Sequence, residues 1–316
     1  MLQVGLGPLG IQIAGELHRR ELGRIVAAVD PALAGEPFGD VTVQPALAAV
    51  ADVAVDAAIV TTVSDLRACA PTLHELAARG IAIVSTCEEL SWPWDRHPEV
   101  ARALAAAAEQ HGARILGTGV NPGFVMDALA VAATTACAEV RRIEIHRIQD
   151  ATTRRLPFQK KIGAGLTVEE FTAKVHDASV RHVGLAESIT MIADAMGWKL
   201  DRVTDDIGPK MATARVTSDF LTVEAGQVCG LIQDGVGYVK GEPLIKLHME
   251  AYLGAPESFD AVRVKGNPPL SMKIAGGVHG DVATASIVVN SIPKILKAAP
   301  GVRTMKDMML PSYFGG

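Results

Sequence analysis

The sequence has few aromatic residues, no excess of basic charge and no long uncharged run. The last two of these shortages argue against nucleic-acid binding and against a membrane span. Aromatic side chains make up 4% of the 316 residues, and the formal net charge is −5. No basic stripe or tail is present, so we expect no nucleic-acid partner. No uncharged run reaches the roughly 20 residues that a membrane span needs. We therefore expect no membrane association.

Cysteine is scarce as well, and its spacing excludes a disulfide framework or a zinc motif. The four cysteines are widely separated and form no C-x-x-C pair. We expect reduced, mostly buried thiols, which are typical of a cytoplasmic protein. The chain opens directly on an expected strand, which leaves no room for a signal peptide. The nine histidines show no H-E-x-x-H spacing, so we expect no metal.

Apolar residues are abundant, at 49%, and a glycine motif lies at the chain start. Residues Gly5-Leu6-Gly7-Pro8-Leu9-Gly10 read G-x-G-x-x-G between a short apolar strand and a helix. This context predicts a dinucleotide-binding turn. The first glycine would make the turn, the second would admit a pyrophosphate, and the third would let the helix pack closely on the strand. Pro8 suits the first helical position.

An acidic residue stands where the adenosine ribose would bind. A second expected strand, residues 24–29, ends in Asp30, which lies 20 positions after Gly10. A carboxylate there would bind the ribose hydroxyls and repel a 2′-phosphate, which favours NAD, with NADP as the alternative. The other interpretation is a glycine turn in an unrelated βαβ unit, with Asp30 as a simple turn residue.

The first 120 residues alternate strand and helix signals, which predicts an α/β domain with a doubly wound parallel sheet of the Rossmann type. Ligands bind beyond the carboxyl ends of such strands. We therefore add Thr61, Thr62 and Asn121 to the predicted cofactor-binding residues. Residues 1–122 would form this domain, and the last helix and tail, 280–316, would return to it.

The pattern changes after residue 122. Helical spacing runs from Thr167 to about residue 196, and mostly strand signals with glycine turns follow from 202 to 277. This predicts an α+β second domain, residues 123–279, with a mainly antiparallel sheet covered by helices on one face. We expect it to carry the substrate-binding and dimerisation surfaces.

Two adjacent acids follow a buried strand, residues 81–85, and are the candidate catalytic residues. Glu88 and Glu89 would lie beside the nicotinamide. In an extended backbone adjacent side chains point in opposite directions, so one acid would face the cofactor. A carboxylate there suits an ammonium or iminium group and can accept a proton. A solvated pair at a helix start is the alternative interpretation.

Two further loops are candidate sites. In the loop from Gly119 to Phe124, Asn121 precedes a proline, which holds the asparagine backbone extended. Asn121 could contact a ligand, and the loop could equally be a hinge that joins the two domains. The basic loop of residues 154–161 is most simply a solvated charge run. Phe158, Gln159 and Lys160 remain candidate pocket residues, with Lys160 able to hold a substrate carboxylate.

These motifs together resemble a known family. The sequence G-L-G-P-L-G, S-T-C-E-E-L at 85–90, G-V-N-P-G-F at 119–124 and R-R-L-P-F-Q-K-K-I-G-A-G at 154–165 is similar to 2,4-diaminopentanoate dehydrogenases and the related native amine dehydrogenases. Both are related in fold to dihydrodipicolinate reductase. The resemblance implies NAD(P)-dependent reductive amination of a ketone or aldehyde with ammonia, and the reverse oxidative deamination.

The resemblance also implies site residues and an assembly. A glutamate of the E-E pair would contact the substrate nitrogen, Phe124 and Val125 would line the substrate pocket, and the protein would be a homodimer. The H-H-x-x-K motif of the reductase and the E-K-P triplet of sugar dehydrogenases are absent. The triplet has lysine where this chain has Glu89, which points to Glu89 and to nitrogen chemistry.

The functional prediction is an NAD(P)-dependent oxidoreductase acting on amines. One alternative is a 2,4-diaminopentanoate dehydrogenase that acts on a diamino acid, which needs a carboxylate clamp. The other is a non-catalytic sensor that binds a nicotinamide cofactor without turnover. The acid pair argues against the sensor, because binding alone needs no proton acceptor.

Overall fold

The protein forms two compact units, described here from a computed structural model. The structure describes residues 1–177, 179–180 and 182–314. One unit comprises Met1–Phe124 with His279–Gly316, and the other comprises Val125–Val278. The domain boundaries expected from the sequence lay at residues 122 and 280.

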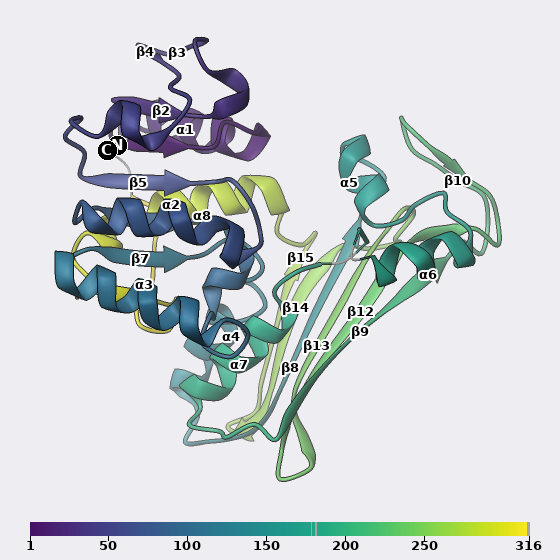
Figure 1. Ribbon diagram of the computed structural model, residues 1–316. Helices are drawn as coiled ribbons and strands as arrows, with labels where there is room; N and C mark the ends of the chain where they lie inside the picture. The colour runs from purple at the N-terminus through teal and green to yellow at the C-terminus, as the bar shows by residue number, and fades with distance from the viewer. Residues whose placement is uncertain (178, 181, 315–316) are drawn as a thin grey trace. The chain divides into compact units, whose positions relative to one another are not determined.

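A six-stranded parallel sheet forms the centre of the first unit (Figure 1). In spatial order its strands are β16 (Gly301–Arg303), β7 (Arg114–Gly117), β6 (Ala82–Ser85), β5 (Ala57–Val60), β1 (Leu2–Val4) and β2 (Ala27–Val29). The chain leaves β1 for β2 on one side and then crosses to β5 on the other. Such a reversal opens a crevice at the carboxyl ends of the two strands, where open α/β sheets bind their ligands.

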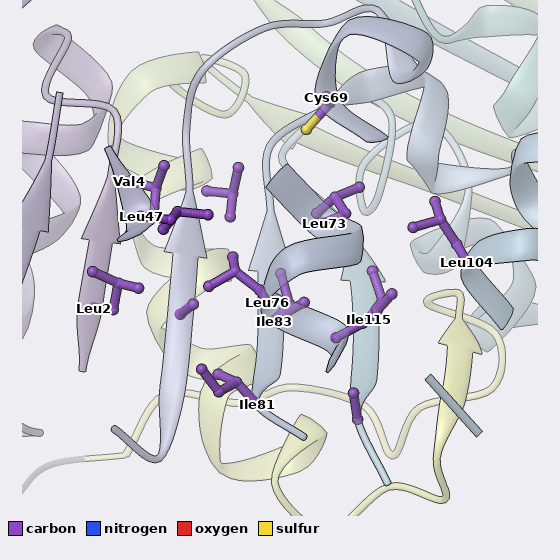
Figure 2. Close-up of a cluster of buried hydrophobic side chains, with 14 of the residues drawn as sticks. Leu2, Val4, Leu47, Cys69, Leu73, Leu76, Ile81, Ile83, Leu104 and Ile115 are labelled. Atoms are coloured by element: carbon purple, nitrogen blue, oxygen red, sulfur yellow. The ribbon is translucent and has the colours of Figure 1, made fainter. Parts of the chain in front are cut away.

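Helices cover this sheet in two pairs. They are α1 (Pro8–Arg19), α2 (Leu66–Ala78), α3 (Pro98–His111) and α8 (Gly280–Ile295), with 3-10 turns η1 (Pro31–Leu33), η2 (Leu47–Val50) and η3 (Glu88–Ser91) and a small hairpin of β3 (Pro37–Phe38) and β4 (Val41–Thr42). Helix α2 packs against α3, and α1 against α8. Figure 2 shows leucines of α2 and α3, among them Leu73, Leu76 and Leu104, gathered with Ile83 and Ile115 of the central strands. This buried layer fixes the positions of the strand ends.

A second six-stranded sheet forms the other unit. In spatial order its strands are β15 (Leu270–Ala275), β14 (Phe259–Asn267), β8 (Glu139–Asp150), β13 (Glu242–Tyr252), β12 (Val228–Val239) and β9 (Arg202–Met211), beside a short pair of β10 (Val216–Thr217) and β11 (Thr222–Val223). Only β8 and β13 run parallel among the described pairs of this sheet. One parallel sheet and one mainly antiparallel sheet, each with helices, confirm the predicted fold class.

This unit also contains several short helices. They are α4 (Ala128–Ala133) with the 3-10 turn η4 (Thr134–Ala136), α5 (Leu156–Lys161), α6 (Val168–His176) and α7 (Leu185–Ala195). Helix α7 packs on β9, β12 and β13. Along β13, Ile245 and Leu247 are buried, whereas Lys246 is exposed and His248 half-buried. The sheet therefore has one apolar, covered face and one polar face.

Two expectations about local structure were wrong, and one contact of the tail, which does return to the first unit as expected, was not foreseen. Residues 156–161 of the expected basic loop form α5, which begins at Leu156 and tolerates Pro157 in its first turn, where backbone N–H groups have no partner within the helix. The helical stretch expected from 167 to 196 is two helices, although the capping box of Thr167 and Glu170 is present. The tail contributes β16, whose Gly301 amide donates to Ala113 (2.9 Å). Each case depends on contacts or caps that periodicity does not report.

Candidate active site

The residues predicted in the first unit gather at one edge of its sheet. All of its described strand pairs are parallel, so every carboxyl end lies at the same edge. The glycine turn follows β1, Asp30 follows β2, Thr61 follows β5, the two acids follow β6, and Asn121 lies beyond β7. The fold thus places the candidate cofactor and catalytic residues around one ligand-binding edge.

The three motif glycines have the geometry that a dinucleotide turn requires. Gly5 has φ +88°, and a Cβ there would lie 2.7 Å from the Thr61 carbonyl oxygen. A Cβ at Gly10 would lie 2.2 Å from the Gly5 carbonyl oxygen. A Cβ at Gly7 would meet nothing within 4 Å. Two glycines are therefore needed by the fold itself, whereas Gly7 leaves open space in which a pyrophosphate fits.

Two alanine substitutions separate these roles. Gly10→Ala forces the turn away from the helix, so we expect a loss of about 1–3 kcal/mol in the free energy of unfolding together with loss of nucleotide binding. Gly7→Ala should unfold like wild type and lose only nucleotide affinity. Thermal unfolding and nucleotide titration measure both effects. A Gly10→Ala protein as stable as wild type would contradict the close packing.

The start of α1 provides backbone donors for an anion. Gly7 is its N-cap without a side-chain cap, and Pro8 lies in the first turn. The first intrahelical bond is donated by Ile11 to the Gly7 oxygen (3.0 Å), so the amides of Leu9 and Gly10 precede it. Amides at a helix N-terminus bind phosphate groups. The residues present therefore fit a dinucleotide pyrophosphate.

A cleft of about 570 Å³ adjoins this turn and includes the predicted ribose-binding acid. The Asp30 carboxylate accepts one hydrogen bond on each oxygen, from the amides of Leu6 (2.8 Å) and Ala32 (2.9 Å). Each oxygen retains a further acceptor site for a ribose hydroxyl. The Thr61 hydroxyl donates to the Gly5 oxygen (2.8 Å) and so supports the turn, while Thr62 is exposed at the cleft.

The two candidate acids lie on a 3-10 turn, η3, and not on extended backbone. The expected extended backbone was therefore wrong, since successive side chains of such a turn are about 120° apart, although the two acids still differ in what they face. The turn lies directly on β7, where a Cβ at Gly117 would come within 2.6 Å of the Leu90 backbone. The packing on Gly117 holds the acids in a fixed place.

Glu89 is engaged inside the protein. Its carboxylate is 1% exposed and accepts from the Leu66 amide at the start of α2 (2.9 Å). It lies 2.7 Å from Nε2 of the buried His97 and 3.4 Å from the guanidinium of Arg96. Sequence reasoning missed His97, whose only signal was its place before the proline that begins α3.

Glu88 is half-buried and differs from its neighbour in its contacts. Its backbone oxygen accepts from the Ser91 hydroxyl (2.7 Å), which closes the turn. Within the described part of the chain, its carboxylate makes no hydrogen bond or ion pair. Of the two acids, Glu88 is therefore the one whose carboxylate is available to a ligand.

The neighbouring Cys87 is not a nucleophile in this arrangement. A hydrogen bond with Cys69 and burial raise the pKa of the Cys87 thiol far above its usual value. Its thiol donates to the Ser64 oxygen (3.2 Å) and so links the loops after β5 and β6. A protonated, buried thiol is inert, so Glu88 and Glu89 remain the candidate reactive groups at this strand end.

Asn121 lies in a tight loop after β7. It is 8% exposed and precedes Pro122 through a cis peptide bond. The Val120 amide donates to the Thr284 hydroxyl of α8 (3.2 Å), which attaches the loop to the first unit. Its contact with a cofactor remains a prediction.

The predicted substrate-binding residues are divided between the units. Phe124 ends the first unit and is half-buried, whereas Val125 begins the second and is 1% exposed. On α5, Lys160 is exposed and Phe158 packs under the Arg154 guanidinium, 4.3 Å from its ring centre. Their role in substrate binding remains a prediction.

Gln159 has a different environment from its neighbours on α5. It is fully buried, and its amide nitrogen donates to three backbone oxygens at 2.8–3.1 Å. Its amide oxygen accepts from the Ser218 hydroxyl (2.8 Å). Both ends of the amide are thus occupied within the second unit, which makes Gln159 a support for the loop around it and disfavours direct substrate contact.

The described residues contain neither a metal-binding cluster nor a membrane-spanning helix. None of their His, Cys, Asp and Glu side chains groups in threes as a metal site requires. None of their helices has the length and apolarity to cross a membrane.

Comparison with known proteins identifies the family. Residues 124–316 match the family model described as the 2,4-diaminopentanoate dehydrogenase C-terminal domain. The chain is also 32% identical over 334 residues to a 2,4-diaminopentanoate dehydrogenase of Acetoanaerobium sticklandii, an alignment that covers 99% of this chain and 94% of that protein. The chain belongs to the 2,4-diaminopentanoate dehydrogenase family. This confirms the predicted family and, because its relatives are dehydrogenases, the predicted oxidoreductase class.

Two solved structures of enzymes have the same fold as this chain. An amine dehydrogenase from Mycobacterium smegmatis is 21% identical and superposes with a TM-score of 0.85, covering 99% of this chain and 97% of that one. A dihydrodipicolinate reductase from Paenisporosarcina sp. TG-14 is 13% identical with a TM-score of 0.56, covering 98% of each chain. The 2,4-diaminopentanoate dehydrogenase family thus shares its architecture with both enzymes.

Proposed function

We propose that this protein is an NAD-dependent amine dehydrogenase in which Glu88 contacts the substrate nitrogen. The observation that carries the proposal is the Glu88 carboxylate, half-buried, without a partner among the described residues, and held beyond β6 on a packed turn. The net reaction converts an amine, NAD⁺ and water into a carbonyl compound, ammonia, NADH and a proton. In reverse it is the reductive amination of a ketone or aldehyde.

In the proposed reaction the residues of this chain hold the substrate in position and supply a negative charge near its nitrogen. The cofactor, when bound, supplies a hydride acceptor or donor at its nicotinamide ring. Glu88 would hold the substrate ammonium by a charge-assisted hydrogen bond and accept its proton, so that the nitrogen lone pair can assist hydride loss. Glu89 would keep η3 in place through Leu66 and His97. It is a positioning residue.

The choice of NAD is supported by the acid at the end of β2. Asp30 adjoins the cleft and keeps acceptor sites for ribose hydroxyls. A fold relative from Agrobacterium radiobacter, 12% identical with a TM-score of 0.57 and covering 97% of this chain and 92% of that one, was solved in complex with NAD⁺. NADP remains the alternative cofactor.

Asp30→Ser should shift the cofactor preference toward NADP. Removing one like charge beside a 2′-phosphate is worth roughly 1 kcal/mol in water-like surroundings, so we expect the ratio of kcat/KM for NADP to that for NAD to rise about fivefold. Steady-state kinetics with both cofactors measure the ratio. An unchanged ratio would remove Asp30 from the ribose site.

The substrate is either a simple alkyl amine or a diamino acid such as the relative's name indicates. A diamino acid needs a cation for its carboxylate, and the exposed Lys160 of α5 is the candidate. We expect Lys160→Ala to raise KM for a diamino acid and leave that for an alkyl amine unchanged. Equal effects on both substrates would assign Lys160 no part in recognition.

We also propose a homodimer formed through the polar face of the second sheet. That face has both signs of charge, with His248 bonded to Asp234 (2.7 Å) and Lys210 to Glu250 (2.7 Å). Lys246, beside them on β13, is exposed. Mixed charges of this kind suit a self-complementary contact with a second copy.

Light scattering tests the assembly. The wild type should have twice the chain mass. Val236 of β12 lies opposite Lys246 on the polar face, and Val236→Asp, which adds a charge to that face, should reduce the mass to that of one chain. A wild type of one chain mass would contradict the homodimer.

The four unbridged cysteines accord with a reducing compartment, and we propose the cytoplasm.

A panel of alkyl amines and diamino acids with NAD⁺, followed by NADH absorbance and ammonia release, tests the function. We expect NADH and ammonia in equal amounts from at least one amine. Binding of NAD⁺ without NADH from any amine would instead support the non-catalytic sensor.

A further inference from the structure

The cleft beside the glycine turn contains a second acid that the nucleotide-binding motif does not include. Its walls are the glycine turn, the end of β2, the segment 45–47, the loop after β5 and one face of α2. The α2 wall consists of Pro71, Thr72 and Glu75, which share a face because positions four apart lie one turn above each other. The glycine turn and Asp30 account for the phosphates and the ribose, so α2 borders the adenosine end.

The charge of the cleft has one sign. Among its described lining residues, Asp30 and Glu75 are the only ionised side chains, and none is a lysine or arginine. A 2′-phosphate in this cleft would bring about two negative charges toward two carboxylates without a cation to receive it. Both carboxylates, that of Asp30 and that of Glu75, therefore disfavour NADP in this cleft.

Glu75 has no structural role that would explain it. It is exposed, and its carboxylate makes no hydrogen bond or ion pair within the ranges that the structure describes. The cation four residues later, Arg79, donates to the Val53 oxygen instead (2.9 Å). An acid in the last turn of α2 is also unfavourable toward the helix dipole. Helix stability therefore does not account for this carboxylate.

We propose that Glu75 is a second residue that selects NAD against NADP, acting by its charge on the adenosine end of the cleft. This rests on the proposed use of a nicotinamide cofactor. Because the carboxylate is exposed and acts through solvent, its effect is smaller than that of Asp30 and is screened by salt. It makes no required contact with NAD, so removal of its charge leaves NAD binding almost unchanged.

Direct titration of nucleotide into the protein, without turnover, tests this. We expect Glu75→Gln to tighten NADP⁺ binding about two- to fivefold at low salt, and to change the Kd for NAD⁺ less than twofold. The gain should disappear at about 1 M salt, where the screening length is about 3 Å. Glu75→Lys, which reverses the charge, should tighten NADP⁺ further in the same direction.

The matched control is Glu99→Gln, which removes the same charge from an exposed position of α3 outside the cleft. If Glu75→Gln changes NADP⁺ affinity no more than this control while NAD⁺ still binds, the inference about Glu75 is wrong and the proposed function stands. If Glu75→Gln weakens NAD⁺ instead, the residue is a cofactor contact and not a charge selector. If wild type binds neither nucleotide, the proposed function fails together with the inference.

Discussion

Glu88→Gln should lower kcat for amine oxidation by about 100- to 10,000-fold, the usual contribution of a positioned proton acceptor. Glutamine has the size of glutamate but can neither accept the ammonium proton nor attract the positive charge. Its stability should equal that of wild type, because the carboxylate makes no described contact that the substitution would remove. Nucleotide affinity should also be unchanged. Steady-state kinetics with the best amine, NAD⁺ titration and thermal unfolding together measure these effects.

Full activity in Glu88→Gln would contradict the assignment of Glu88 as the residue that accepts the ammonium proton.

Glu89→Leu should lower the free energy of unfolding by about 3–5 kcal/mol, because it removes one partner from a buried, charged arrangement. The Leu66 amide would lose its acceptor at 2.9 Å, and Nε2 of His97 its partner at 2.7 Å. Neither group could turn to water, since Leu66 is 0% and His97 7% exposed. Denaturant unfolding measures the loss, and activity should fall because η3 loses its anchor.

Glu89→Gln is the matched control for this prediction. Its amide oxygen can still accept from Leu66, so most of the stability should return, and a large part of the activity with it. A Glu89→Gln protein that is stable but inactive, beside an active Glu88→Gln protein, would reverse the roles of the two acids. That outcome would agree with the comparison to the lysine of sugar dehydrogenases.

The geometry of the glycine turn could be predicted because its requirements are local. Gly5, Gly7 and Gly10 are needed by a single turn and the helix that follows it, and Asp30 ends the adjacent strand. A motif of adjacent residues specifies such a site almost completely. Glu75 gave no signal, because its place at the cleft depends on how α2 lies against β1 and β5.

The position of the two candidate acids along the fold could be predicted, but the different surroundings of Glu88 and Glu89 could not. The sequence placed both acids after β6, yet the partners of Glu89 are eight and 23 residues away, at His97 and Leu66. Periodicity does not report such pairing, and the assumption of an extended backbone failed because the turn packs on Gly117. The burial of Gln159 gave no signal for the same reason, since its acceptors come from the folded loop around it.

A crystal structure of the protein with NAD⁺ and an alkylammonium inhibitor tests the central claim most directly. The distance to measure joins the inhibitor nitrogen to the nearest carboxylate oxygen at the end of β6. The account predicts that Glu88 binds the nitrogen at about 2.7–2.9 Å, while Glu89 stays bonded to Leu66 and His97. A nitrogen bound by Glu89, or by neither acid, would contradict it.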